Sequence, residues 1–144
     1  EDALIQNMTK FLLELGSGFA FVGQQYKIIV DKNDFKIDLL FYHVKLHCYV
    51  VVELKTTDFK PEYTGKLNFY ITAIDEQVKS EFDNPTIGIL ICKSKSDMIV
   101  EYALRNVTTP IGISQYELTE ILPKEYQSSL PSIEQIEAEL EGVK

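Results

Sequence analysis

Residues 34–55 read DFKIDLLFYHVKLHCYVVVELK, and this stretch decides the fold. Apolar, aromatic and β-branched residues fill 34–43 and 47–55, and only the short link around 44–46 separates the two runs. Such runs are typical of β-strands, and a short link between them favours an antiparallel hairpin. The stretch therefore predicts two neighbouring strands with charged residues set into otherwise apolar surroundings.

The remaining periodic stretches complete the order α-β-β-β-α-β-α-β. A β-rich run at 20–30 precedes the hairpin and extends it to a three-stranded antiparallel meander. Apolar residues at helical spacing fill 3–15, and the Gly-Ser-Gly of 16–18 ends that helix. After the meander we expect a helix at 64–79, a strand at 86–92, a helix at 96–105 capped by Ser96, and a strand at 111–118.

The length and composition fit one globular domain. The chain has 144 residues, of which 45% are hydrophobic and 25% charged, enough to bury a single core. We expect residues 1–144 to form one domain, with an acidic helical tail at 123–144 packed on it. Because the chain begins Glu-Asp rather than Met, we also expect a piece of a longer protein.

Charge, cysteines and hydropathy limit the partners and the compartment. The net charge is -8, yet residues 1–72 hold 9 acidic and 8 basic side chains, so a local cationic groove is compatible with the composition. Cys48 and Cys92 each lie in an apolar run and are expected to be reduced core residues. No apolar stretch approaches the roughly 20 residues of a membrane span, so we expect a cytoplasmic protein without membrane contact.

Three charged residues interrupt the apolar hairpin: Asp38, Glu53 and Lys55. Because strand side chains alternate, Glu53 and Lys55 share one face of the sheet. Asp38 joins them if the hairpin loop has an even number of residues. A two-residue loop at 45–46 sets it opposite Glu53, one at 44–45 sets it diagonal to Glu53, and a three-residue loop separates them. His43 and His47 flank this loop, and we expect them to be turn residues near the edge of the site rather than zinc ligands.

This combination of charges indicates a phosphodiesterase site. Two adjacent carboxylates repel one another, and a divalent ion such as Mg²⁺ is the natural compensator. A lysine beside them can orient the attacking water and offset charge on the phosphoryl oxygens. The alternative is a half-exposed polar face, in which Glu53 and Lys55 form a surface ion pair of at most ~1 kcal/mol.

Ile37-Asp38, fourteen intervening residues and Glu53-Leu54-Lys55, set in this element order, resemble the PD-(D/E)XK nuclease superfamily. The phrases GSGFAFVGQQY, FKIDLLFYH, VVVELK, FKPEYTGKLNFY, NPTIGILICKSK and VEYALRNVTTPIG are similar to the YhcG family, whose C-terminal domain is such a nuclease. The resemblance implies a restriction-endonuclease-like αβββαβ core with a mixed central sheet flanked by helices, an α/β (α+β) fold. It also implies that this domain follows an N-terminal domain in the same protein.

The resemblance further implies roles for individual residues. Asp38 and Glu53 would be metal ligands, the Leu54 carbonyl a third, and Lys55 the residue that serves the water. Glu14 matches an acidic residue that many relatives use as an outer-sphere ligand, although a solvated surface Glu is an equal alternative. Ile37 replaces the superfamily's proline, a common departure.

Other residues are candidates for contact with nucleic acid. Relatives often place a Gln early in the helix after the meander, where this chain has Lys66 with Tyr70 one turn later. Lys93 and Lys95 follow a buried strand and are further candidates, against the alternative of a solvated loop.

The resulting expectation is an Mg²⁺- or Mn²⁺-dependent nuclease domain acting on nucleic acid, with DNA preferred. Two alternatives stay open. One is a noncatalytic nucleic-acid- or protein-binding module with the same fold. The other is self-association, a homodimer made through the tail helix and the sheet edge, which is compatible with either function.

Overall fold

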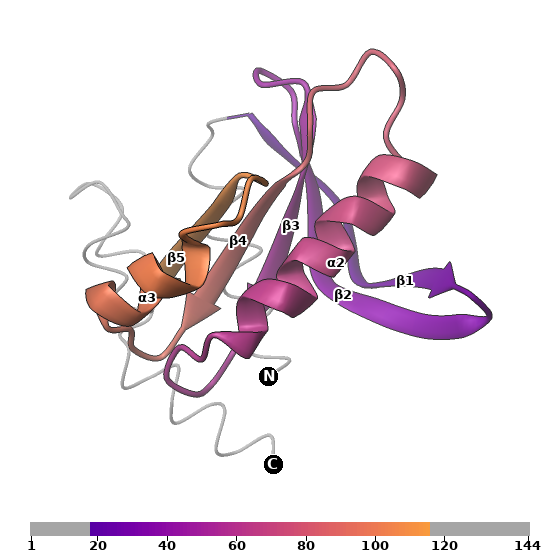
Figure 1. Cartoon of the computed structure of the whole chain (residues 1–144). Coiled ribbons are helices and arrows are strands. Elements are labelled where there is room, and N and C mark those ends of the chain that lie inside the picture. The colour runs from indigo at the N-terminus through magenta and orange to yellow at the C-terminus, as the bar shows by residue number, and fades with distance from the viewer. Residues whose placement is uncertain (1–17, 116–144) are drawn as a thin grey trace, which may run out of the picture.

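The computed structural model describes residues 18–115 of the chain and shows a five-stranded sheet with two helices (Figure 1). The expected helix at 3–15, with Glu14, and the expected tail at 123–144 lie outside these residues. The described elements match the expected order and fall within a few residues of the expected bounds. They are β1 (Phe19–Val30), β2 (Asn33–His43), β3 (Cys48–Leu54), α2 (Glu62–Gln77), β4 (Ile87–Cys92), α3 (Asp97–Leu104) and β5 (Ile111–Gln115).

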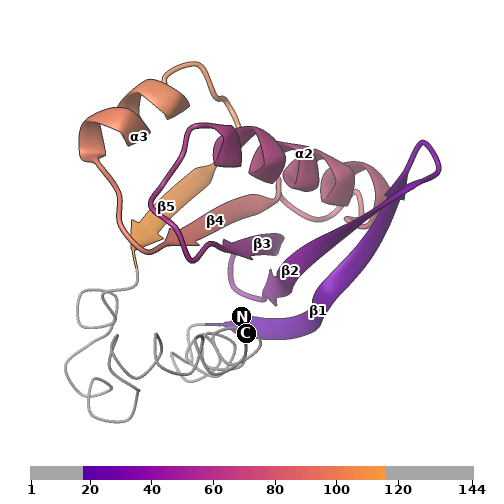
Figure 2. The ribbon, with the colours of Figure 1, turned by 90° about the horizontal axis from the view of Figure 1, so that it is seen from below.

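The sheet is mixed, as expected, with strand order β1-β2-β3-β4-β5. β1, β2 and β3 pair antiparallel, whereas β3, β4 and β5 run parallel. Each parallel connection includes one helix, and right-handed crossovers that move in one direction across a sheet place their helices on the same face. Figure 2 shows α2 and α3 together on one side of the sheet.

The core between α2 and the sheet consists of aliphatic side chains at helical and strand spacing. Leu67, Ile71 and Ile74 of α2 are fully buried against residues such as Leu40 and Val51. The helix approaches β4 so closely that a Cβ atom on Gly88 would lie 2.6 Å from Ile71 Cδ1. The glycine therefore permits the close packing of α2 on β4.

The turn between β2 and β3 fixes the register of the central hairpin. Pairing runs from His43↔Cys48 to Leu39↔Val52, so the loop comprises the four residues 44–47. This register equals that of a two-residue loop at 45–46, the first of the two expected arrangements. Asn84 holds the turn from outside, since its N–H donates to the His47 carbonyl and its side chain donates to the Leu46 carbonyl.

β1 and β2 continue beyond β3 as a two-stranded ribbon, seen in Figure 1. The ribbon packs on α2, where the rings of Phe35 and Phe69 lie 4.8 Å apart between centroids and the Gln77 side chain donates to the Ile29 carbonyl. Its pairing shifts by one residue between Phe21 and Gly23. The ribbon is therefore anchored to the helix but is irregular where it enters the sheet.

Smaller expectations are also confirmed. Ser96 caps α3, accepting a hydrogen bond from the Ile99 N–H. Cys48 and Cys92 are buried free thiols. No helix within residues 18–115 has the length and apolar character needed to cross a membrane.

Candidate functional site

Asp38 and Glu53 meet where β2 and β3 stop pairing. Regular pairing ends at Leu39↔Val52, and the next residue of each strand is one of the two acids. The Asp38 N–H donates to Glu53 Oε2 over 2.7 Å, and the Leu54 N–H donates to Asp38 Oδ2 over 2.8 Å. Side-chain hydrogen bonds therefore replace the backbone pairing at this point and hold both carboxylates in place.

Glu53 is the more perturbed of the two acids. Only 2% of its surface is exposed. Burial, and next the negative charge of Asp38, raise the pKa of Glu53 to about 7, against the opposing effects of the Asp38 N–H, Lys66 and Lys55. A buried carboxyl whose pKa is raised by a second carboxyl is a frequent feature of functional sites.

Two lysines lie close enough to Glu53 to stabilise its charge, and each lies against an aromatic ring. Lys55 Nζ is 5.1 Å from the centroid of the Tyr63 ring, and Lys66 Nζ is 5.7 Å from that of Tyr70. Tyr70 is buried, and its pKa is raised by that burial and by Glu53. The helix α2 thus brings Lys66 and Tyr70 to the acid pair at the end of β3.

The end of β4 forms the neighbouring rim. Because β3 and β4 are parallel, the segments that follow them run side by side: the Lys93 N–H donates to the Thr57 carbonyl, and Ser94 Oγ donates to Asp58 Oδ1. Lys93 is exposed, whereas Lys95 Nζ forms an ion pair with Asp97 at 2.6 Å. Both lysines therefore lie at the end of the sheet that carries the acids, and the anionic partner of Lys95 is Asp97.

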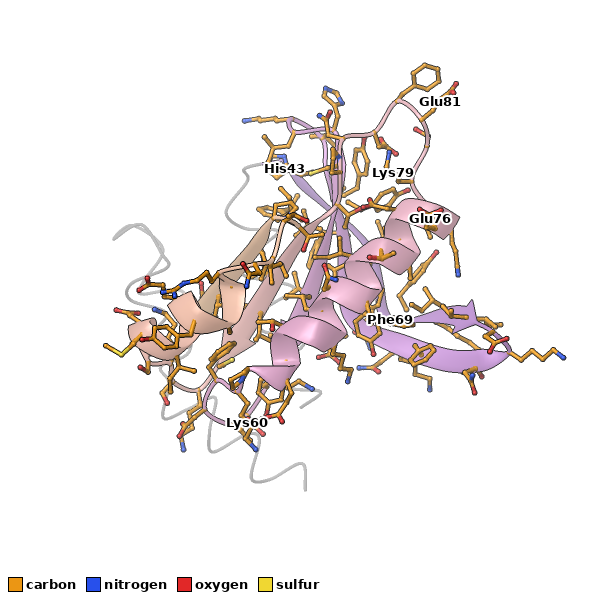
Figure 3. The ribbon with its side chains drawn as sticks, in the orientation of Figure 1. His43, Lys60, Phe69, Glu76, Lys79 and Glu81 are labelled. Atoms are coloured by element: carbon orange, nitrogen blue, oxygen red, sulfur yellow. The ribbon has the colours of Figure 1, made fainter. Side chains whose placement is uncertain are left out.

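The expectation that His43 is a turn residue is confirmed, but its expected position near the site was wrong. It pairs with Cys48 at the start of β3, whereas Glu53 is near the end of that strand. Lys60 lies in the segment between the end of β3 and the start of α2, and so marks the end of the sheet where Glu53 lies. In Figure 3, His43 lies at the opposite end of the sheet from Lys60. His43 accepts a hydrogen bond from the Leu46 N–H and packs on Phe19, so it stabilises the turn.

The donor set around the acid pair fits a hard divalent cation. One oxygen of each carboxylate is held by a backbone N–H, and the other oxygens, Glu53 Oε1 and Asp38 Oδ1, accept no backbone N–H from the described residues. The N–H and C=O of a strand residue point to the same side, so the Leu54 carbonyl points toward Asp38 as its N–H does. Two carboxylates with carbonyl and water oxygens are typical ligands of Mg²⁺. In the part of the chain that the structure covers, no group of three or more His, Cys, Asp or Glu is placed to hold a metal.

Sequence reasoning missed Gln25, and it weighed Tyr63 only as an aromatic that stacks on bases or packs in the core, not as a neighbour of Lys55. The Gln25 side chain donates from Nε2 to Asp38 Oδ1 over 3.4 Å, and the Tyr63 hydroxyl lies 2.5 Å from Thr57 Oγ1 while its ring faces Lys55. The pair of glutamines at 24–25 gave no signal because the register of β1 was unknown. Tyr63 is one of several aromatics at helical spacing, a pattern that usually indicates a core residue.

The chain matches one family model and one curated sequence of that family. Residues 1–131 match the family described as the YhcG PDDEXK nuclease domain. YhcG of Escherichia coli (strain K12) is 38% identical over 118 residues, which cover 82% of this chain and 32% of that protein. The chain therefore spans about a third of the length of this relative.

Two solved structures share the fold. A repair endonuclease from Pyrococcus abyssi superposes with a TM-score of 0.50 at 18% identity, covering 76% of this chain and 44% of that chain. A complex of EndoMS with double-stranded DNA gives a TM-score of 0.51 at 17% identity, covering 75% of this chain and 43% of that chain. These similarities confirm the restriction-endonuclease-like fold.

Proposed function

Since the chain belongs to the family of YhcG PDDEXK nuclease domains, we propose that it hydrolyses phosphodiester bonds of DNA with a divalent metal ion, Mg²⁺ or Mn²⁺. The observation that carries the proposal is the joined pair of Asp38 and Glu53, with Glu53 buried and its pKa raised. Keeping two carboxylates together without a cation is costly. Binding a metal ion there would offset that cost.

In this proposal Asp38 and Glu53 hold the metal through the oxygens that no described backbone N–H occupies, with the Leu54 carbonyl as a third protein ligand. A divalent ion at such a site polarises a phosphoryl oxygen and lowers the pKa of a bound water. The backbone N–H groups of Asp38 and Leu54 fix both carboxylates and so limit their reorientation.

Lys55 and Lys66 supply the positive charge. Lys55 follows β3 directly and stabilises the Glu53 carboxylate, which places its ammonium group beside the acid pair. There it orients the attacking water and offsets charge on the phosphoryl oxygens. Lys66, exposed at the start of α2, contacts a phosphate next to the scissile one.

DNA is the proposed substrate. One of the solved structures with this fold is printed as a complex with double-stranded DNA, and the rim next to the acids carries Lys93 and Lys95 in addition to Lys66. Binding through a few lysines predicts an affinity that falls steeply with salt even though the net charge is -8. We further propose that residues 1–131, which match the nuclease-domain family, act as one nuclease domain.

A calorimetric Mn²⁺ titration of the chain, followed by cleavage assays on linear and branched DNA, tests the proposal. We expect the wild type to bind Mn²⁺ and Asp38→Asn to lose both binding and cleavage without unfolding. Asp34→Asn is the matched control, because Asp34 is exposed on the same strand and paired with Lys27. Equal binding by the wild type and Asp38→Asn, or none with DNA present, would favour the noncatalytic module.

A further inference from the structure

Gln25 of β1 lies opposite the proposed metal ligand Asp38 of β2. Pairing on either side is regular, with Gln24↔Leu39 and Tyr26↔Ile37, so the register places Gln25 opposite Asp38. These two residues do not form a regular pair themselves. Instead the Gln25 side-chain amide donates to Asp38 Oδ1 over 3.4 Å.

The backbone of Gln25 adopts a conformation that a glutamine rarely takes. Its φ is +46°, in the left-handed region, where a residue other than glycine pays a conformational cost. Such a cost persists only where the surrounding structure imposes it, and it is concentrated at functional sites. At this position it accompanies a side chain that reaches a proposed metal ligand.

The irregularity in β1 decides which glutamine faces Asp38. The pairing of β1 with β2 shifts by one residue between Phe21↔Phe41 and Gly23↔Leu40. The shift is a β-bulge, in which β1 contains one extra residue between Phe21 and Gly23. If the pairing continued regularly from Phe21↔Phe41 without a bulge, Gln24 would lie opposite Asp38. The bulge therefore brings Gln25 to Asp38 and leaves Gln24, which is exposed as Gln25 is, opposite Leu39.

We propose that Gln25 is a positioning residue that sets the orientation of the Asp38 carboxylate toward the metal, an inference that rests on the proposed function. The Leu54 N–H fixes Oδ2 at 2.8 Å, and Oδ1 is left to meet the cation. Rotation of a carboxylate about its last bond is only loosely restricted by the side chain itself. The Gln25 amide donates a hydrogen bond to one lone pair of Asp38 Oδ1, which limits this rotation. The second lone pair of Oδ1 is then left to bind the metal.

Gln25→Met tests the proposal, with Gln24→Met as its matched control. Methionine keeps the length of the side chain and the same left-handed backbone cost but has no amide donor. We expect Gln25→Met to weaken Mn²⁺ binding about tenfold, as is usual for a residue that orients a metal ligand, and Gln24→Met to change it less than twofold. The measurements are calorimetry and the electron paramagnetic resonance spectrum of bound Mn²⁺, which changes if a ligand is reoriented.

A second variant separates the amide from the backbone. Gln25→Gly removes the amide and also relieves the left-handed cost, so it keeps the fold, which thermal unfolding checks. It should bind Mn²⁺ as weakly as Gln25→Met. In cleavage assays both variants should lower kcat with little change in the KM for DNA, because the amide contacts Asp38 and not the substrate.

The outcomes distinguish this inference from the proposed function. If the wild type binds Mn²⁺, Asp38→Asn does not, and both Gln25 variants bind like the wild type with an unchanged resonance spectrum, Gln25 has no positioning role and the metal site stands. If wild type and Asp38→Asn behave alike, the proposed metal site is wrong and the role of Gln25 fails with it.

Discussion

The N–H of Asp38 donates to Glu53 Oε2 over 2.7 Å, so the backbone of one acid supports the side chain of the other. The same two residues oppose each other electrostatically, because the charge of Asp38 helps to raise the pKa of Glu53. One contact therefore fixes the geometry, while the charges make the pair unstable without a cation.

Glu53→Gln should stabilise the protein at pH 8 in the presence of a chelator. The pKa of Glu53 is about 7 in the folded state against an ordinary value of 4.5, so the folded state binds the proton more tightly. The resulting stability is fully present below pH 4.5 and is lost as the pH rises through 7, by up to about 3 kcal/mol at 1.4 kcal/mol per pKa unit. Urea unfolding from pH 5 to pH 8 measures the loss, which the variant should lack.

Glu76→Gln, on the exposed side of α2, is the control for that experiment and should follow the pH profile of the wild type. A Glu53→Gln protein less stable than wild type at pH 8 would contradict the raised pKa.

Tyr63→Leu should lower cleavage about tenfold, whereas Tyr63→Phe should retain most of it. The ring lies under the Lys55 ammonium at 5.1 Å and limits where that group can go. Phenylalanine keeps the ring and loses only the contact between its hydroxyl and Thr57. Single-turnover cleavage rates at saturating metal would check this, and equal rates for both variants would rule out a role for the ring.

Lys66→Met should weaken DNA binding more than Lys95→Met. Lys66 is exposed beside the acids. The Lys95 ammonium group forms an ion pair with Asp97 at 2.6 Å, so its charge is already partly neutralised and it attracts a phosphate less strongly. Loss of one phosphate contact lowers the slope of log affinity against log salt by about one. Fluorescence anisotropy over a salt series gives both slopes, and a larger effect at Lys95 would reverse the assignment.

Gly88→Ala should destabilise the fold by about 1–3 kcal/mol, because the added Cβ atom would overlap Ile71 Cδ1 at 2.6 Å and press on Leu67. Gly112→Ala on β5 is the matched control, since its Cβ atom would meet nothing within 4 Å. Urea unfolding of both variants tests the difference. Displacement of α2 would also move Lys66, so Gly88→Ala should lose cleavage activity out of proportion to its remaining folded fraction.

Much of the sheet could be predicted from the sequence because its signals are local. Runs of β-branched and aromatic residues marked β2 and β3, and alternation placed Glu53 and Lys55 on one face. The choice between two even loops could not be made locally. It depends on Asn84, which reaches the turn from another part of the chain and donates to the carbonyls of Leu46 and His47.

The site was predicted only as far as its residues follow regular strand geometry. The proximity of Asp38 and Glu53 followed from strand pairing and is confirmed. The approach of Gln25 depends on an extra residue in β1, and no pattern in the run FAFVGQQYKIIV marks where that residue is accommodated. The contact of Tyr63 with Lys55 depends on how α2 docks, which helical periodicity does not specify.

The hydrogen bonds of Asp38 to Gln25, Glu53 and Leu54 join residues that are 13, 15 and 16 positions apart in the chain. Closing such short loops costs little chain entropy, whereas the parallel pairing of β3 with β4 must wait until the whole of α2 is in place. We therefore expect the site to assemble early in folding. As the chain leaves the ribosome, Asp38, Glu53 and the residues that hold their carboxylates are synthesised before the strands that finish the sheet.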